Sequence, residues 1–488
     1  MRVLEWSLVA MVMAGTLPPL IGCYQYLLVA LHPLRRGRLG ADAVATPRVA
    51  IIVPAWNEAA VIARTVDQLL DLDYPSDRFR VYVVDDGSDD ETPALVRGLA
   101  DAHPGRVFHL RREDGGQGKA HTINHGLRLI RAEDWFEAVL VIDADVLFTR
   151  DSLPRMTSHL TDPDVGAVTA YIKEGTRPGN YLNRFVAFEY VTAQAGARRA
   201  QNMLGAMACL AGGAQLIRRS TLESIGGAID TDTLAEDTVT TLLIQLRGER
   251  VVFEPEAIVW AEEPSKLGGL WKQRVRWGRG NVQVTSRFRW VWFHLRSWGA
   301  LGGPSFGLIW FTVTLMPIFM VASSFGLVAL YLLDSTFARD IFRALWAVNF
   351  FTYLFITGAS FALDRETARR AWREGLAFPG LISLTVILYA GFPQLFRDAG
   401  LVPHGALLVA TTLCVYVWLS ASMLAAYLVK KLEDGARLAR LVAPLVYVVG
   451  YGPLLCAMTA AAYWREIRGA EMRWEKTEKL GKAAGDLA

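Results

Sequence analysis

Two aspartates, Asp143 and Asp145, stand one residue apart where the apolar segment "AVLVI" ends. If that segment is an extended strand, residues i and i+2 point the same way, so the two carboxylates face one side. With no basic residue nearby they repel, unless a divalent cation lies between them and the oxygens of a ligand. Mg²⁺ and Mn²⁺ prefer such oxygen ligands, and phosphate oxygens can complete the shell. The pair is a candidate metal site, and the alternative is two solvated turn aspartates.

Two further polar clusters follow apolar, β-branched segments. Pro54-Ala55-Trp56-Asn57-Glu58 ends "RVAIIVP", and Asp85-Asp86-Gly87-Ser88 ends "RVYVVDD". The second cluster could begin a turn in which Ser88 or Asp89 caps the following helix. Asp86 could equally hydrogen-bond a base or a ribose, and spacing alone leaves these two interpretations even.

A glycine-rich segment, "DGGQGKAHTINHG", occupies residues 114–126. It lacks the P-loop pattern, because Ala120 follows the lysine where serine or threonine is required. A glycine-rich loop that leads into a helix can still bind an anion through its backbone N–H groups, with Lys119 as a point charge. A flexible surface loop explains the composition equally well.

Glu236 and Asp237 begin the apolar helical segment "EDTVTTLLIQL". Acidic residues in the first turn of a helix complement its dipole, which is a sufficient structural explanation. A catalytic base could also occupy this position, partly sheltered and facing a cleft. From composition alone the structural role is favoured.

The segment "LWKQRVRWGRG" (270–280) carries an amide, a guanidinium and an indole at helical spacing. Gln273, Arg276 and Trp277 fall at i, i+3 and i+4 and share one face, which suits hydrogen bonding and stacking against a sugar. The alternative is an interfacial helix on anionic lipid, and both can hold. The remaining cations are expected to meet lipid headgroups or acidic neighbours: Lys272, Arg274 and Arg279.

Short strands and helices alternate in the segment that carries these residues. Strands are predicted at 48–54, 80–86, 106–110 and 138–145, and helices at about 58–71, 91–102 and 118–130. Such alternation predicts an α/β domain with a mostly parallel sheet, in which ligands bind beyond the carboxyl ends of the strands. All three acidic or amide clusters fall at those ends, so they are expected to meet at one edge.

The composition indicates a membrane protein with one soluble domain. Of the 488 residues 52% are hydrophobic and 20% are charged, and the apolar residues concentrate at the N-terminus and beyond residue 300. A net charge of +3 argues against a nucleic-acid partner. The four cysteines lie too far apart for a zinc cluster or a disulfide framework.

Five parts are expected along the chain. Residues 1–35 form an uncleaved transmembrane signal anchor whose basic flank "HPLRRGR" places the following domain in the cytosol. The other four are a soluble domain (45–265), interfacial amphipathic helices (266–298), a multi-span region (299–465) and a basic cytosolic tail (466–488). Candidate spans lie at 304–333, 341–363, 376–396, 403–429 and 441–464. The third is interrupted by "FPG" and "GFPQ" and is expected to be re-entrant or interfacial.

Taken together, these motifs resemble the membrane-embedded, inverting family-2 glycosyltransferases, which include the cellulose, hyaluronan, chitin-oligosaccharide and poly-N-acetylglucosamine synthases. The resemblance covers residues 48–285 and rests on "VPAWNE", "VVDDGS", "GKA" with Asn124 and Gly126, "DAD", "AEDT" and "QRVRW" in that order. The wording of "FEPEAIVW" and "LWKQRVRW" is most similar to the poly-N-acetylglucosamine branch. Where cellulose synthases carry an "FFCGS"-type motif, this chain has "CLAGGA" (209–214), which argues against cellulose as the product.

The resemblance implies a GT-A nucleotide-sugar fold, a UDP-sugar donor such as UDP-GlcNAc or UDP-Glc, and Mg²⁺ or Mn²⁺. It implies that Ala55 and Glu58 lie by the uracil, with Asp86 at its edge. Lys119 is placed near the donor, and Asp143 and Asp145 bind the nucleotide and its metal. It makes Asp237 the general base, against the structural role favoured by composition. The remaining roles fall to "QRVRW": Arg276 for the donor diphosphate, and Gln273 and Trp277 for the acceptor sugar.

The expected protein is thus a multi-pass plasma-membrane hexosyltransferase with its catalytic domain in the cytosol. It would processively extend a β-linked polysaccharide and extrude the growing glycan across the lipid bilayer. The main alternative is a non-processive transferase acting on a ceramide- or polyprenyl-type lipid. A catalytically silent membrane scaffold is a third, disfavoured because buried carboxylates cost stability. Any export or accessory subunit is left open by the sequence.

Overall fold

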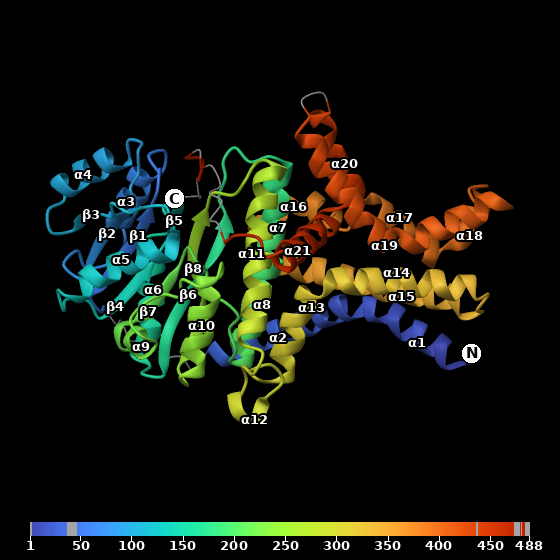
Figure 1. The fold of residues 1–488 in the computed structure, drawn as a ribbon, viewed down its shortest axis with the longest axis horizontal. Coiled ribbons are helices and arrows are strands. Elements are labelled where there is room, and N and C mark those ends of the chain that lie inside the picture. Colours follow the sequence, from blue (N-terminus) through green and yellow to red (C-terminus); the bar gives the residue numbers. More distant parts are fainter. Residues whose placement is uncertain (1, 37–45, 436–437, 473–478, 480, 484–488) are drawn as a thin grey trace. The chain divides into compact units, whose positions relative to one another are not determined.

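The computed structural model describes residues 2–36, 46–435, 438–472, 479 and 481–483. The chain folds into two compact units (Figure 1). The first comprises Met1–Leu27, Lys266–Arg279 and Leu308–Gly469, and the second comprises Leu28–Ser265, Gly280–Gly307 and Ala470–Ala488. Of the predicted segments, residues 37–38 of "HPLRRGR" and residues 473–478, 480 and 484–488 of the tail lie outside the described residues.

An eight-stranded sheet forms the centre of the second unit, in the order β3-β2-β1-β4-β7-β6-β8-β5. Strands β1 to β4 are mutually parallel where they pair, β7 is antiparallel to both β4 and β6, β6 and β8 are parallel, and β5 is antiparallel to β8. The strands are β1 (Val49–Ala55), β2 (Phe79–Asp85), β3 (Val107–Arg111), β4 (Ala138–Val141), β5 (Val146–Phe148), β6 (Val165–Glu174), β7 (Gln215–Arg218) and β8 (Arg250–Ala261).

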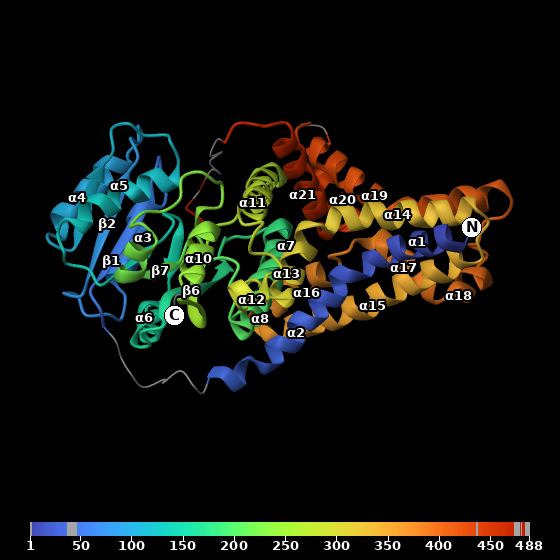
Figure 2. The same cartoon turned by 60° about the horizontal axis from the view of Figure 1, so that its bottom comes forward.

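The predicted alternation of strands and helices is present in the first half of this sheet. Helices α3 (Ile62–Leu70), α4 (Thr92–Ala102) and α5 (Lys119–Arg131) connect β1 to β4. Because the chain reverses its direction along the sheet after β3, right-handed crossovers place α5 on the face opposite α3 and α4 (Figure 2). The resulting topological switch point lies between β1 and β4, where a ligand crevice is expected.

The expectation of a mostly parallel sheet is confirmed, because only β5 and β7 run against the other six strands, and β7 enters between β4 and β6. Helices complete the half of the domain beyond β4: α6 (Ser152–Ser158), α7 (Tyr181–Tyr190), α8 (Ala197–Leu204), α9 (Arg219–Ser224) and α10 (Glu236–Leu246), with a π-helical segment, Val191–Gly196, between α7 and α8. The antiparallel pairing brings the start of β7 beside the end of β4, at the switch-point edge.

The first unit is helical and packs around an apolar core that includes Val12, Leu330 and Leu345. It contains the part of α2 (Leu17–Arg36) up to Leu27. Its other main helices are α1 (Arg2–Met13), α14 (Met316–Leu332), α15 (Phe337–Leu363), α16 (Arg365–Leu376), α17 (Leu381–Gly391), α18 (Pro393–Asp398), α19 (Ala406–Glu433), α20 (Val442–Val449) and α21 (Tyr451–Ile467). Within the described residues, three segments are long and apolar enough to cross a membrane: Arg2–His32, Phe337–Leu363 and Ala406–Glu433. Their number rises to six if each of three bent helix pairs is one span.

The bends fall at proline and glycine positions. The predicted span 304–333 is a pair, α13 (Pro304–Thr314) and α14, bent by 71° with Pro317 at the start of α14. Around "FPG", α16 and α17 meet at 70°, with Gly380 at φ +88°. Helix α17 covers 11 residues, about 17 Å at 1.5 Å per residue. Alone it is shorter than a bilayer core, and its re-entrant or interfacial placement stays a prediction.

Candidate active site

The loop that follows β1 is fastened to the loop that follows β2. The backbone N–H of Asn57, which has φ +56°, donates to Ser88 Oγ at 2.9 Å, and the N–H of Glu58 donates to Thr92 Oγ1 at 2.8 Å. Glu58 is buried, as is Ala55 at the end of β1. Two of the predicted donor-binding residues therefore lie at the switch-point edge of the sheet, beside the "DDGS" turn.

Asp85 is a structural carboxylate in this turn. It is fully buried, accepts from Arg111 at 2.7 Å and from the N–H of Ser88 at 2.9 Å, and lies 3.3 Å from His109 Nε2. Burial acts to raise its pKa, but the bonds from His109 and Ser88 and the charge of Arg111 outweigh this and lower the pKa to about 2. Asp85 thus holds the turn in place and leaves the neighbouring Asp86 facing the glycine-rich loop.

Asp86 contacts the glycine-rich loop directly. Arg112 donates to its Oδ1 at 2.6 Å, and the N–H of Gly116 donates to its Oδ2 at 2.9 Å. A Cβ on Gly115 would lie 1.9 Å from the carbonyl oxygen of Asp86, so this position requires glycine. The glycines of "DGGQG" therefore allow the backbone of this loop to pack closely against Asp86. The alternative of a flexible surface loop is thus disfavoured for these residues.

Lys119, the first residue of α5, lies beside Asp143. Its Nζ is 2.5 Å from Asp143 Oδ1, donates to the carbonyl of Gly212 at 3.0 Å, and lies 3.9 Å from Glu236 Oε1. Burial acts to lower the pKa of this ammonium, but the charges of Asp143 and Glu236 outweigh it and raise the pKa. Lys119 therefore stays protonated and provides a fixed positive charge at the crevice.

Asp237 reaches the same point from α10. A Cβ built on Gly212 would lie 3.1 Å from Lys119 Nζ, 3.4 Å from Asp237 Oδ2 and 3.9 Å from Asp143 Oδ2. Three predicted site residues from distant parts of the sequence thus surround one glycine of "CLAGGA". The N–H of Thr238 donates to Asp237 Oδ1 at 2.7 Å, which fixes one carboxylate oxygen.

Asp145 differs from the expectation in two ways. Strand β4 ends at Val141 and a turn at residues 144–145 follows Asp143, so the premise that an extended chain aligns the two carboxylates is wrong. The premise that no basic residue is near is also wrong, because Lys119 pairs with Asp143 and Lys479 pairs closely with Asp145. Tertiary packing brings both lysines from segments that the local sequence does not reveal.

Lys479 is held in this position by the segment that follows β8. Its Nζ also donates to the carbonyl of Glu262 at 2.7 Å, and Lys482 donates its N–H to the Glu262 carboxylate at 2.9 Å. Burial acts to lower the pKa of Lys479, but the charges of Asp145 and Glu263 outweigh it, so the pKa lies above its usual range. An ammonium therefore neutralises one carboxylate of the candidate metal pair.

A metal at this position would rely on ligands from its substrate. Within the described residues no three His, Cys, Asp or Glu side chains are arranged to hold a metal ion. Asp143 and Asp145 supply carboxylate oxygens, and the side chain of Asp143 remains 39% exposed. Two hard oxygen donors of this kind fit Mg²⁺ or Mn²⁺ with a diphosphate completing the shell.

The "QRVRW" residues lie in the part of α11 (Leu267–Arg287) that belongs to the first unit. Gln273 is buried and Trp277 is 38% exposed. The Arg274 guanidinium donates to Gln273 Oε1 at 2.5 Å and lies 4.1 Å from the Trp277 ring centroid. Arg274 thus contacts two residues of the predicted sugar-binding face, whereas Arg279 pairs with an acidic neighbour, Glu466, as expected.

Two participants were missed by sequence reasoning. Gly212 was noted within "CLAGGA" without a role, and a glycine between two candidate site segments is a weak signal of close approach. Lys479 lies far along the chain from Asp145 and carried no local signal.

Cys209, at the start of "CLAGGA", has a raised pKa, because burial and the nearby charge of Asp237 disfavour its thiolate.

A doubly wound sheet with acidic residues and a lysine gathered at its switch point is typical of nucleotide-binding α/β domains and agrees with the expected GT-A fold. Residues 47–280 match the protein family described as glycosyltransferase like family 2. This segment, a little under half of the chain, is therefore similar to the family-2 glycosyltransferases.

Known proteins support this assignment. The probable glycosyltransferase YdaM of Bacillus subtilis is 31% identical over 51% of this chain and 59% of its own length. The poly-beta-1,6-N-acetyl-D-glucosamine synthase of Staphylococcus epidermidis is 27% identical over 56% of this chain and 64% of its own length. The chain thus spans less than two thirds of either relative.

A solved structure extends the similarity beyond the catalytic domain. The mannosyltransferase PcManGT from Pyrobaculum calidifontis, in complex with GDP-Man and Mn²⁺, aligns with 81% of this chain and 99% of its own. The TM-score is 0.53 and the sequence identity is 25%. The alignment confirms the GT-A fold of the catalytic domain.

Proposed function

We propose that the chain is an inverting polysaccharide synthase that transfers hexose units from a UDP-sugar, UDP-GlcNAc or UDP-Glc, to a growing β-linked glycan. The observation that carries the proposal is the convergence of Lys119, Asp143 and Asp237 on Gly212. A cation for the leaving group, a metal-binding carboxylate and a base are the groups that one displacement at an anomeric carbon needs. The similarity to a poly-N-acetylglucosamine synthase supports the same substrate class.

In this proposal the switch-point edge binds the donor. Ala55, Glu58 and Asp86 contact the uracil, and Lys119 lies beside the diphosphate. Asp143 and Asp145 hold Mg²⁺ or Mn²⁺, and the bound ion supplies Lewis-acid stabilisation of the diphosphate charge. From the family resemblance we also assign Arg276 to the diphosphate, and Gln273 and Trp277 to the acceptor sugar.

The reaction is a single displacement. Asp237 accepts the proton of the acceptor hydroxyl as its oxygen attacks the anomeric carbon and the bond from that carbon to the diphosphate breaks. The configuration inverts, and UDP leaves without requiring a proton because Lys119 and Arg276 stabilise its negative charge. One base therefore suffices, in contrast to the paired carboxylates of glycosidases.

We further propose that the enzyme is processive and resides in the plasma membrane with its catalytic domain in the cytosol. The apolar helices of the first unit would then pass the polymer across the bilayer. The basic flank of the N-terminal apolar segment supports this orientation. Extrusion also requires that each product remain bound as the next acceptor.

A second candidate is the transfer of single mannose units from GDP-mannose. The alignment with PcManGT, whose structure holds GDP-Man and Mn²⁺, covers 81% of this chain. A mannosyl donor therefore belongs in the experiment, together with a lipid acceptor.

The test uses the full chain purified in detergent with Mg²⁺ or Mn²⁺. Labelled UDP-GlcNAc, UDP-Glc and GDP-mannose are supplied in turn, and the products are sized. A ladder of high molecular weight with a UDP-sugar supports the synthase, whereas a single lipid-soluble product supports the second candidate.

The assignment of the base has its own control. Asp237→Asn should abolish transfer, while Asp232→Asn, an exposed aspartate in the same segment, should leave it unchanged. Full activity in Asp237→Asn would refute the proposed mechanism.

A further inference from the structure

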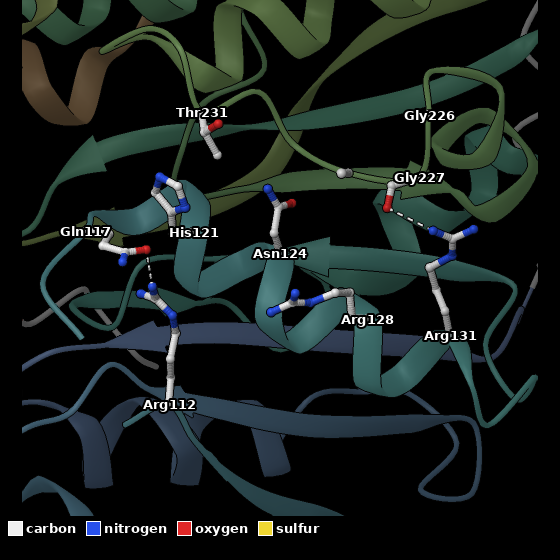
Figure 3. Close-up of a pocket in the computed structure, with 10 residues that line it drawn as sticks. Arg112, Gln117, His121, Asn124, Arg128, Arg131, Gly226, Gly227 and Thr231 are labelled. Carbon is white, nitrogen blue, oxygen red and sulfur yellow. Dashed lines mark hydrogen bonds between the residues drawn. The ribbon is translucent and has the colours of Figure 1, made fainter. Parts of the chain in front are cut away.

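A basic cavity of about 390 Å³ lies in the second unit, between α5 and the loop 226–231 (Figure 3). Arg112, His121, Arg128 and Arg131 line it, together with Gln117, Asn124 and the loop. Among the described residues that line the cavity, none is acidic. Its volume lies within the range of small-molecule sites, roughly 300–1,000 Å³.

The cavity faces the side of α5 that is turned away from the sheet. His121, Asn124, Arg128 and Arg131 follow one another at intervals of three, four and three residues, which places them on one helix face. The opposite face carries the buried Ile123, Leu127 and Ile130. The basic row is thus separate from Lys119 and Asp143, which meet at the start of the helix.

The loop that closes the cavity is fastened to this helix. Asn124 donates to the carbonyl of Ile229 at 2.8 Å and accepts from the N–H of Ile229 at 2.8 Å. Arg131 donates to the carbonyl of Gly227 at 3.2 Å, and Gly227 has φ +72°. A Cβ on Gly227 would lie 2.2 Å from Arg131 Nη1, so the glycine permits this close approach. Specific contacts therefore fix the loop side of the cavity, while Arg128 and Arg131 are exposed on its open side.

The positive charge on the cavity wall is only partly neutralised, because Arg112 pairs with Asp86. Within the described part of the chain, neither Arg128 nor Arg131 pairs with a carboxylate, and Arg128 has a 3.5 Å contact with His125. The pKa of His125 is lowered by burial and by the charges of Arg128 and Arg112, with Asp86 opposing them. The helix face therefore carries a positive potential that favours anions.

We propose that this cavity binds a phosphate-bearing ligand at a site separate from the donor crevice. One guanidinium group can donate two parallel hydrogen bonds to the oxygens of a phosphate. Arg128 and Arg131 lie on the same face of α5, about one helical turn apart. The phosphate belongs either to a soluble metabolite or to a lipid headgroup, and both present the same chemistry to these side chains.

Arg112 connects the cavity to Asp86. It lines the cavity, donates to Asp86 Oδ1 at 2.6 Å, and also hydrogen-bonds Gln117. A phosphate in the cavity competes with Asp86 for this guanidinium. Phosphate binding therefore changes the contacts of Asp86, which we have assigned to the uracil of the donor. This coupling between the cavity and the donor crevice rests on the proposed function.

The binding test does not require activity. Pyrophosphate is titrated calorimetrically into the full chain in detergent with EDTA, which keeps metal away from Asp143 and Asp145. Binding should weaken about tenfold or more in Arg128→Gln, because a charge-assisted hydrogen bond is lost. Arg97→Gln removes the same charge from an exposed position on α4 and should leave binding unchanged.

Two further arms separate the possible outcomes. Lys119→Met should leave unchanged the pyrophosphate binding that depends on Arg128. A loss of binding in Lys119→Met, with no loss in Arg128→Gln, would assign the anion to the donor crevice and overturn the proposal. Equal binding by the wild type and Arg128→Gln would also overturn it. Displacement of pyrophosphate by micellar phosphatidylglycerol indicates a lipid headgroup, and no displacement indicates a soluble ligand. Either result that overturns the phosphate site would leave the proposed sugar transfer unaffected.

Discussion

Adding one methyl group at Gly212 should slow sugar transfer by up to about a hundredfold while leaving the fold intact. The alanine Cβ would lie 3.1 Å from Lys119 Nζ, 3.4 Å from Asp237 Oδ2 and 3.9 Å from Asp143 Oδ2. It would thus occupy the space where the proposed reacting atoms must lie. Gly212 does not have a left-handed backbone, so alanine can adopt its conformation without backbone strain.

The size of the effect follows from these distances. The contact with Lys119 is tighter than an ordinary van der Waals contact, so the lysine or the loop must move by a few tenths of an ångström. Displacing reacting groups by up to 1 Å costs about 10²-fold in rate, or about 3 kcal/mol of transition-state stabilisation. The free energy of unfolding should change by less than about 1 kcal/mol, because alanine also restricts the unfolded chain.

The assay compares kcat/KM and the melting temperature of Gly212→Ala with those of Gly98→Ala. Gly98 lies within α4 and has no atom within 4 Å of a built Cβ. Alanine there should preserve activity and stabilise the helix by up to about 1 kcal/mol. If Gly212→Ala keeps wild-type kcat/KM with an unchanged melting temperature, the reacting groups do not meet at this glycine.

Three further outcomes follow from charged groups in the second unit. Burial raises the pKa of Glu174 to about 7 from 4.5, so its stabilising effect is complete below pH 4.5 and is lost as the pH rises through 7. Glu174→Gln should remove about 3 kcal/mol of that pH dependence in unfolding measured from pH 4 to 8. The pKa of Asp85 is lowered to about 2, so its contribution is complete above pH 3.8 and is lost as the pH falls through 2. Asp85→Asn should lower the free energy of unfolding by about 2 kcal/mol at pH 7 and by less at pH 3, as measured by denaturant titration. Lys479→Met removes the cation that pairs with Asp145 and should lower the Mn²⁺ concentration for half-maximal activity. Lys482→Met is the control. If both variants need the same Mn²⁺ concentration, Lys479 does not compete with the metal for Asp145.

Much of the first half of the catalytic domain could be predicted from the sequence. The strand predicted at 48–54 is observed at Val49–Ala55, and that at 80–86 at Phe79–Asp85. These segments are runs of β-branched residues buried on both faces, which is the strongest local signal for a parallel strand. Strand β6 gave no such signal, although it is buried throughout, because Thr169, Lys173 and Glu174 interrupt its apolar sequence.

The candidate site was predicted in its members but not in its contacts. Asp143 and Lys119 were selected separately, and their pairing depends on how α5 packs against the sheet. Asp237 was assigned a structural role from composition, because a first-turn acid needs no further explanation. Its closeness to Gly212 is a tertiary contact that spacing along the chain cannot reveal. The same limit applies to Lys479.

The antiparallel pairing of β4 and β7 has a consequence for the precision of the site. Val141 lies opposite Gln215, so the chain leaves β4 toward Asp143 directly beside the chain that enters β7 from Gly212. The register of the central hydrogen-bond ladder therefore sets the spacing of these residues, and a two-residue slip would separate them by about 7 Å. Amide exchange from Val139 to Val141 should accordingly be as slow as global unfolding permits. The enzyme would then lose its active-site geometry only when the sheet itself opens.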